Sequence, residues 1–133
     1  MKIVNVTGKR KKAIARAVLS PGTGIIRINK MPIDALNNWM AQMKIQEPLE
    51  LASEHINNVD INISVSGGGV LSQADAARLA IAKGLVSYTK SEKLKETFLN
   101  YDRTLLVADV RQREAKKPNT HGNARSKRQK SYR

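Results

Sequence analysis

Residues 59–88 read VDINISVSGGGVLSQADAARLAIAKGLVSY and predict a strand, a glycine-rich turn and a long helix. In 59–66, Val or Ile alternates with Asp, Asn or Ser, which is the pattern of a half-buried strand. The Ser-x-x-acid pattern of 72–75 predicts a capping box, and the helix is expected to run to about Tyr88. Its apolar stripe has helical spacing and consists of Ala74, Ala77, Ile81, Leu85 and Tyr88. With so many alanines, this helix can lie close to a sheet.

Earlier segments predict further strands. Two are expected at 3–6 and 13–20, on either side of the basic stretch KRKK at 9–12. In the second, one face carries Ile14, Arg16 and Val18, and the opposite face carries Ala13, Ala15, Ala17 and Leu19. A third strand is expected at 24–29, and the PGTG turn before it predicts a hairpin over 13–29.

Three shorter helices are expected. Pro32 opens one that ends near Met40, and Pro48, a favoured first-turn residue, opens another to about His55. Ser91 and Glu92 cap the third, which ends near Tyr101 with Leu94, Phe98 and Leu99 facing inward. Residues 105–110 fit a last helical turn or a strand equally well.

This order of elements predicts an α+β fold, a small two-layer α/β sandwich with helices on one face of a sheet. We expect a globular domain over residues 1–110 and an extended basic tail over 111–133. Nothing periodic and apolar follows residue 110, so the tail cannot contribute a core of its own.

The charge is concentrated at the two ends of the chain. The formal net charge is +13, of which residues 1–16 carry +6 and residues 110–133 carry +8, while residues 17–109 carry −1. A solvated surface would spread its charge more evenly. Charge gathered in this way is typical of a protein that binds a polyanion.

Other function classes find little support. Without cysteine, disulfides and thiolate chemistry are excluded, and the two histidines, His55 and His121, belong to no metal-ligand or catalytic pattern. The basic N-terminus lacks the apolar run of a signal peptide, and no stretch approaches the roughly 20 apolar residues of a membrane helix. We therefore expect a soluble intracellular protein, and no residue pattern indicates a metal or a cofactor. Trp39 is expected in the core or at an interface.

The first candidate site is TGKRKKAIARA at residues 7–17, where a turn and the following strand carry several cations. Such a loop can lie across phosphates and release their condensed counterions. The alternative, a solvated hairpin tip, is weakened by the second basic segment at the other end of the chain.

The second candidate is the glycine-rich turn at 67–69, where a strand leads into a helix N-terminus. Backbone N–H groups at such a place can hold a phosphate, which allows a small nucleotide-dependent kinase. However, the turn lacks the GxxxxGK[ST] arrangement of a P-loop. A glycine turn that permits close strand–helix packing is the simpler interpretation, and a backbone phosphate of RNA at the same helix end is a third.

The third candidate is the tail, whose last residues read HGNARSKRQKSYR. If 115–133 is extended, it can reach roughly 60 Å, beyond the radius of the domain. Arg side chains can pair with two phosphate oxygens each, and Tyr132 can stack on a base. A disordered solubilising tail is the alternative, and a generic DNA-compacting protein also stays open.

Five segments together resemble the universal family of small-subunit ribosomal protein number nine, in its archaeal and eukaryotic form. They are GKRKKAIARA (8–17), GTGIIRINKMP (22–32), VSGGGVLSQADAARLAIAKGL (65–85), DVRQREAKK (109–117) and QKSYR (129–133). The resemblance covers essentially the whole chain. It implies a fold like the second domain of small-subunit ribosomal protein number five, with a left-handed βαβ crossover that pattern rules alone would not predict.

The resemblance also implies a function: a structural, RNA-binding protein in the head of the small ribosomal subunit, beside other head proteins and in the cytoplasm. Such a protein is not an enzyme. It implies that the tail reaches the anticodon stem-loop of peptidyl-site transfer RNA, with Lys130, Tyr132 and Arg133 at the tip. The residues expected to bind ribosomal RNA are Lys9, Arg10, Lys11, Lys12, Arg16, Arg111, Arg113, Lys116, Lys117, Arg125, Lys127 and Arg128.

Overall fold

The predicted strand at 59–66 is β5 (Val59–Ser66), the central strand of a five-stranded mixed sheet. The computed structural model describes residues 2–125. The sheet has the order β1-β2-β5-β3-β4, in which β3 and β5 are parallel and the other neighbours are antiparallel. The other strands are β1 (Val4–Arg10), β2 (Ala13–Pro21), β3 (Ile26–Ile28) and β4 (Met31–Pro32).

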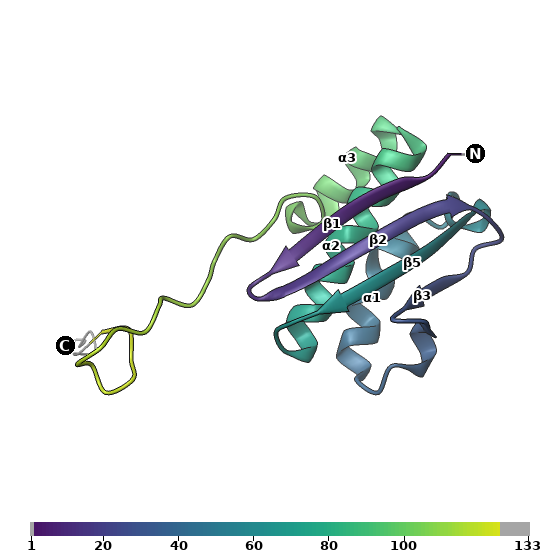
Figure 1. Cartoon of the computed structure of the whole chain (residues 1–133). Helices are drawn as coiled ribbons and strands as arrows, with labels where there is room; N and C mark the ends of the chain where they lie inside the picture. The colour runs from purple at the N-terminus through teal and green to yellow at the C-terminus, as the bar shows by residue number, and fades with distance from the viewer. Residues whose placement is uncertain (1, 126–133) are drawn as a thin grey trace.

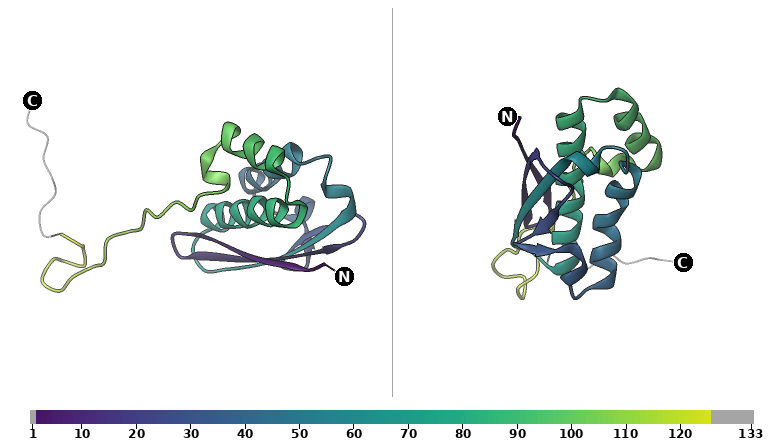
Figure 2. Two further views of the ribbon diagram at one scale, coloured as in Figure 1. Left: turned by 90° about the horizontal axis from the view of Figure 1, so that it is seen from above. Right: turned by 90° about the vertical axis from the view of Figure 1, so that its right-hand side faces the viewer.

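The helices all lie on one face of this sheet (Figure 1), as the sequence predicted. The α-helices are α1 (Trp39–Leu51), α2 (Val70–Thr89) and α3 (Glu92–Tyr101), and short 3₁₀ helices occupy Ile33–Ala35, Ile56–Asn58 and Arg103–Leu105. Figure 2 shows α2 directly over the strands and α3 on the far side of α2 from the sheet. The opposite face of the sheet carries no helix in the described chain.

The core consists of the alternating apolar residues predicted for the strands and the apolar stripe predicted for the long helix, α2. Every second residue of β2 from Ala13 to Leu19 is buried, as are Val59, Ile61 and Ile63 of β5. Four members of the α2 stripe are buried against them, and Tyr88 is partly buried. Because the facing side chains are small, α2 approaches β1 so closely that a Cβ placed on Gly8 would overlap the carbonyl oxygen of Ala76.

The predicted hairpin over 13–29 is wrong, because β5 lies between β2 and β3. The antiparallel partner that β2 finds nearby in the chain is β1, joined through the turn at Lys11 and Lys12. The PGTG segment instead wraps over the start of β5, where the Asp60 Oδ1 accepts backbone hydrogen bonds from Thr23, Gly24 and Ile25 at 2.9–3.1 Å. A carboxylate 36 positions from Gly24 fixes this loop, which a local turn pattern cannot reveal.

The two helices predicted at 32–40 and 48–55 have the wrong bounds. Pro32 opens only the 3₁₀ turn Ile33–Ala35, and Pro48 does not start a helix. The structure has one helix, α1, which begins after Asn38 and passes through Pro48. The Asn38 side chain accepts a hydrogen bond from the Ala41 amide and so caps the helix. Pro48 is fully buried in the core, and this packing offsets the hydrogen bond that a proline inside a helix cannot donate.

Three smaller expectations also need correction. The predicted capping box at 72–75 does not start α2, because the glycine turn leads directly into the helix at Val70 with Gly69 as the N-cap. In α3 the Ser91 cap, Leu94 and Phe98 are confirmed, but Leu99 is 40% exposed. Of residues 105–110, only Leu105 is helical, at the end of a 3₁₀ helix, and 106–110 form neither helix nor strand. Trp39 is 70% exposed, which excludes the core and leaves an interface as the prediction for this residue.

Candidate nucleic-acid interface

The two basic segments of the chain meet at one groove, at the N-terminal end of α2. The groove has a volume of about 670 Å³. Three elements surround it: the tip of the β1–β2 hairpin, the start of α2, and the chain just after Asp109. Its lining residues are Arg10, Lys11, Lys12, Gly68, Gly69, Ser72, Arg111, Gln112 and Arg113.

The glycine turn fixes the hairpin tip against the start of α2. Gly67 and Gly68 adopt positive φ angles of 79° and 65°, which glycine reaches without steric cost. A Cβ on Gly67 would lie 2.5 Å from the carbonyl oxygen of Lys12, and one on Gly68 would lie 3.1 Å from the amide nitrogen of Ala13. Close backbone packing therefore accounts for these glycines, but it is packing of the turn against the β1–β2 hairpin and not the strand–helix packing that the sequence suggested.

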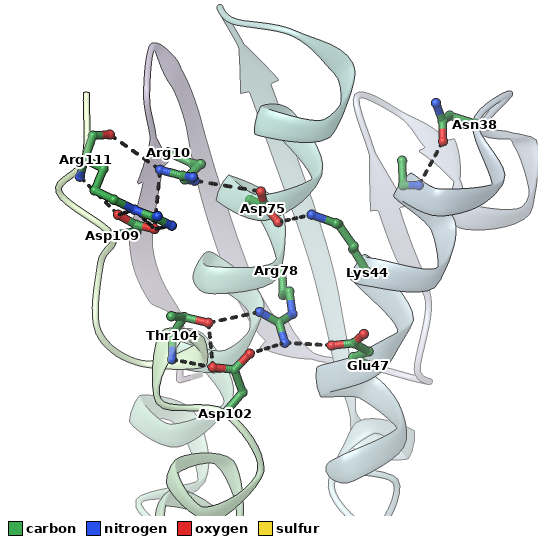
Figure 3. Close-up of polar contacts among 11 residues, drawn as sticks. Arg10, Asn38, Lys44, Glu47, Asp75, Arg78, Asp102, Thr104, Asp109 and Arg111 are labelled. Atoms are coloured by element: carbon green, nitrogen blue, oxygen red, sulfur yellow. Dashed lines mark hydrogen bonds and ion pairs between the residues drawn. The ribbon is translucent and has the colours of Figure 1, made fainter. Parts of the chain in front are cut away.

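Arg10 joins the hairpin to the tail. Its guanidinium lies 3.4 Å from the Asp109 carboxylate and 3.9 Å from that of Asp75 in α2, and it donates a hydrogen bond to the Arg111 carbonyl (Figure 3). Only 18% of its side chain is exposed. Arg10 was predicted to bind RNA, and in the structure its contacts hold together two segments 101 positions apart.

Asp109 lies at the point where the chain leaves the domain, and its carboxylate contacts residues on both sides of that point. Hydrogen bonds from the Arg111 side chain and amide, with the charge of Arg10, hold the pKa of Asp109 well below its usual range. The carboxylate is therefore ionised throughout the physiological range, and the Arg10–Asp109–Arg111 contacts persist there. These contacts place Arg111 and Arg113 beside Lys11 and Lys12 at the groove.

Three groove cations carry no compensating acid. Among the ion pairs of residues 2–125, none involves Lys11, Lys12 or Arg113, and all three side chains are exposed. Lys11 also has a positive φ of 54°, which is costly for a residue with a Cβ. Together with the N-terminus of α2, these cations give the groove a positive potential suited to phosphate groups.

Other predicted residues lie elsewhere. Lys9 and Arg16 point to the helix-free face of the sheet, because their neighbours Gly8, Ala15 and Ala17 face α2. Lys116, Lys117 and Arg125 lie along the tail, where Glu114 pairs with the last two at 3.1 and 3.0 Å. Lys127, Arg128, Lys130, Tyr132 and Arg133 lie outside the described residues.

As far as residue 125, the tail does not follow a fully extended path. It runs away from the sheet and helices (Figure 1). Residues 117–123 close a loop. The backbone amide of Lys117 donates a hydrogen bond to the Asn123 carbonyl at 3.3 Å, and the backbone amide of Asn123 donates one to the Thr120 carbonyl at 3.1 Å. Asn119, His121 and Gly122 supply the positive φ angles of this loop.

Two groove residues, Ser72 and Gln112, were not predicted. Ser72 was interpreted as a helix cap, and Gln112 carries no charge that would single it out. The only signal for Gln112 was its position between Arg111 and Arg113. Within residues 2–125 there is no helix long and apolar enough to cross a membrane, and no cluster of acids and histidines that could hold a metal ion.

The fold and the groove define a class: small basic α+β proteins with cations gathered at a groove and along a tail, as is typical of proteins that bind structured RNA. The family model described as ribosomal protein S9/S16 matches residues 8–133. Proteins named small ribosomal subunit protein uS9 from Methanococcus maripaludis and Methanothrix thermoacetophila are each 50% identical to the chain, and one from Methanococcus vannielii is 48% identical; all three alignments cover both chains fully.

The chain belongs to the ribosomal protein S9/S16 family. This confirms the resemblance seen in the sequence, including its archaeal side, because the relatives come from archaea. The family consists of ribosomal proteins, so the kinase interpretation of the glycine turn is set aside and the prediction that the chain is not an enzyme holds.

Proposed function

We propose that this protein is a structural constituent of the head of the small ribosomal subunit and binds its ribosomal RNA through the groove at the start of α2. The observation that carries the proposal is the meeting of the two basic segments there, around Lys11, Lys12 and Arg113. A merely solubilising charge would have no reason to be gathered and fixed in one place by Arg10 and Asp109. The neighbouring head proteins are further partners, and the ribosome of the cytoplasm is the location.

A paired substitution at the hairpin tip tests this function. We expect Lys11→Gly with Lys12→Gln to weaken binding to small-subunit ribosomal RNA by ten-fold or more at about 0.1 M salt, and to lower the slope of log K against log salt by about 2. Glycine suits the positive φ of Lys11, so the folded domain should keep its stability. Filter binding over a salt series measures both quantities.

Lys93→Gln with Lys95→Gln is the matched control. It removes the same charge from exposed positions of α3, away from the groove. If the wild-type protein binds this RNA with no salt dependence, or if the control and the hairpin variant lose affinity equally, the groove is not the binding site.

We further propose that the tail, residues 111–133, carries this binding beyond the domain of residues 1–110 and reaches peptidyl-site transfer RNA with Lys130, Tyr132 and Arg133. The direction of residues 111–116, away from the domain, supports the first part (Figure 2). The tip itself rests on the family resemblance, because it lies outside the described residues.

Deleting residues 130–133 should leave incorporation into the small subunit unchanged and weaken binding of transfer RNA to its peptidyl site several-fold. The physical reason is the loss of two cations and one stacking ring from the tip. Sucrose-gradient analysis measures incorporation, and transfer RNA binding to the purified subunits measures the second effect. Unchanged transfer RNA affinity would assign the tip another role.

The family resemblance also implies a left-handed crossover in the βαβ unit of β3, α1 and β5, as in the second domain of small-subunit ribosomal protein number five. We propose this topology for the chain. The parallel pairing of β3 with β5, with α1 between them in sequence and on the helical face of the sheet, provides the βαβ unit that such a crossover requires. Its left-handedness rests on the family resemblance.

A further inference from the structure

The helix-free face of the sheet, here called the outer face, is polar and basic. It carries every second residue of each strand, including Lys9, Arg16, Arg27, Asn62 and Ser64. Lys30, in the β3–β4 turn, lines one hollow of this face together with Arg27, Asn62 and Ser64. Arg16 lines a second hollow, whose other lining residues include Asn5, Thr7, Val18 and Lys83 of α2. Arg27 and Lys30 lie outside the groove described above.

Three cations packed between elements on the helical side of the sheet have carboxylate partners, whereas the cations of the outer face do not. On the helical side, Arg10, Lys44 and Arg78 each pair with a carboxylate at 3.4, 2.9 and 2.6 Å. On the outer face, within residues 2–125, no ion pair involves its cations, which are Lys9, Arg16, Arg27 and Lys30. Within residues 2–125, these cations therefore have no carboxylate at ion-pair distance, and the charge of Arg27 acts on Asp60 only from farther away, where it helps to lower the pKa of that carboxyl.

The strands offer this face only one acid, and that acid is already used. The sequences of β1, β2, β3 and β5 contain a single carboxylate, Asp60. Its Oδ1 accepts the amides of Thr23, Gly24 and Ile25. The hydrogen bond from Ile25, aided by those from the other two, lowers the pKa of Asp60 and keeps it committed to the loop. A face with four cations and one committed acid complements a polyanion.

The turn that presents Lys30 is hydrogen-bonded to β5 through Asn29 and has unfavourable backbone angles. Asn29 and Lys30 both have positive φ, 51° and 69°, between the paired residues Ile28 and Met31. Asn29 makes two hydrogen bonds to β5. Its side-chain Oδ1 accepts one from the Val65 backbone amide at 2.9 Å, and its backbone amide donates one to the Ile63 carbonyl at 2.8 Å. Glycine would be the least strained residue after Asn29. Strain retained at an exposed lysine is typical of a functional position.

We propose that the outer face is a second binding surface for the sugar–phosphate backbone of ribosomal RNA, with Arg16, Arg27 and Lys30 as its phosphate contacts. This inference rests on the proposed RNA-binding function and extends it to the side of the sheet opposite the helices. Arg16 lies beside Ser64, and Arg27 beside Asn62, with β5 between the two arginines. Two strand spacings separate them by about 10 Å, so they meet different phosphates while Asn62 and Ser64 bond the sugars between.

The test compares two double variants with the same change in net charge. Arg27→Gln with Lys30→Gly removes two outer-face cations, and the glycine suits the turn, so the thermal midpoint should not fall. We expect it to lower affinity for small-subunit ribosomal RNA by ten-fold or more at about 0.1 M salt, and the salt slope by about 2. Lys93→Gln with Lys95→Gln, on α3, is the control and should change neither.

The outcomes separate this inference from the function on which it rests. If the hairpin variant at Lys11 and Lys12 weakens binding while the outer-face variant behaves like the α3 control, the outer face is not an RNA surface and the groove still is. If wild-type protein shows no salt-dependent binding, both proposals fail.

A photo-crosslinker at Asn62, in protein assembled into the small subunit, decides which partner covers the outer face. We expect p-benzoylphenylalanine at this position to yield adducts with ribosomal RNA. Adducts with proteins alone would overturn the proposal and assign the face to a neighbouring head protein.

Discussion

Gly8→Ala is expected to destabilise the folded state by about 3 kcal/mol, at the upper end of what overpacking a core costs. Gly8 lies in β1 where α2 crosses it. An added Cβ would overlap the carbonyl oxygen of Ala76 and lie 2.8 Å from the amide nitrogen of Ala80. Both are backbone atoms of a helix, so the clash cannot be relieved by rotating a side chain. The sheet and α2 would have to separate, which also loosens the alanine contacts around them.

Urea unfolding followed by circular dichroism measures this loss, and Gly69→Ala is the control. Gly69 has an ordinary negative φ of −95°, and a Cβ there would meet nothing within 4 Å. Its substitution should cost less than about 1 kcal/mol, since only the preference at the N-cap changes. A Gly8→Ala protein as stable as Gly69→Ala would mean that α2 does not lie as close to β1 as the structure has it.

Gly8 also illustrates how far the sequence could predict this fold. The alanine-rich helix was expected to lie close to a sheet, and it does. Which strand it touches depends on the sheet order, and the sheet order depends on β5 inserting between β2 and β3. Local turn patterns favoured a β2–β3 hairpin, because nothing in PGTG indicates that Asp60 binds this loop from a distant strand.

In the candidate site, too, the local features could be predicted from the sequence and the long-range contacts could not. Each basic segment was visible in the sequence as a run of Lys and Arg. Their meeting at one groove was not, because it needs the long-range contact between Arg10 and the carboxylate of Asp109. The sequence also could not separate Lys9 and Arg10, which are neighbours in β1. Alternation along the strand sends Lys9 to the outer face and Arg10 to the helical side.

Arg78→Met is expected to destabilise the protein by about 2 kcal/mol. Arg78 of α2 lies at the centre of a network that joins three parts of the chain: its Nη2 lies 2.6 Å from Glu47 of α1 and 3.2 Å from Asp102, and its Nη1 donates to Thr104 (Figure 3). The arginine side chain is only 12% exposed. Methionine keeps most of its packing but leaves two carboxylates close together without their cation.

The expected loss is smaller than for a fully buried pair, for two reasons. The carboxylates of Glu47 and Asp102 are 36% and 40% exposed, so water recovers part of their solvation. In addition, the buried Arg78 Nε has no hydrogen-bond partner within the described residues, and methionine removes that cost.

Lys44→Met is the matched control, because Lys44 pairs with Asp75 on the same two helices but 33% of its side chain is exposed. It should cost less than about 1 kcal/mol. Chemical unfolding at neutral pH compares the two variants, and equal losses would show that the Arg78 network adds nothing beyond a surface pair.

The pH dependence gives an independent readout of the same network. Partial burial alone would raise the pKa of Asp102, but hydrogen bonds from the Thr104 amide and hydroxyl and from Arg78 lower it. Stability from this carboxylate is present above its unfolded pKa near 3.8 and is lost as pH falls through the lower folded value. The Arg78→Met protein should lose less stability than wild type over that acidic range.

Asp75 and Arg78 lie one turn apart on α2 and hold both ends of the segment that leads into the tail. Asp75 does so through its contact with Arg10, and Arg78 through its contact with Asp102. The helix that packs on the sheet therefore also sets where the tail leaves the domain.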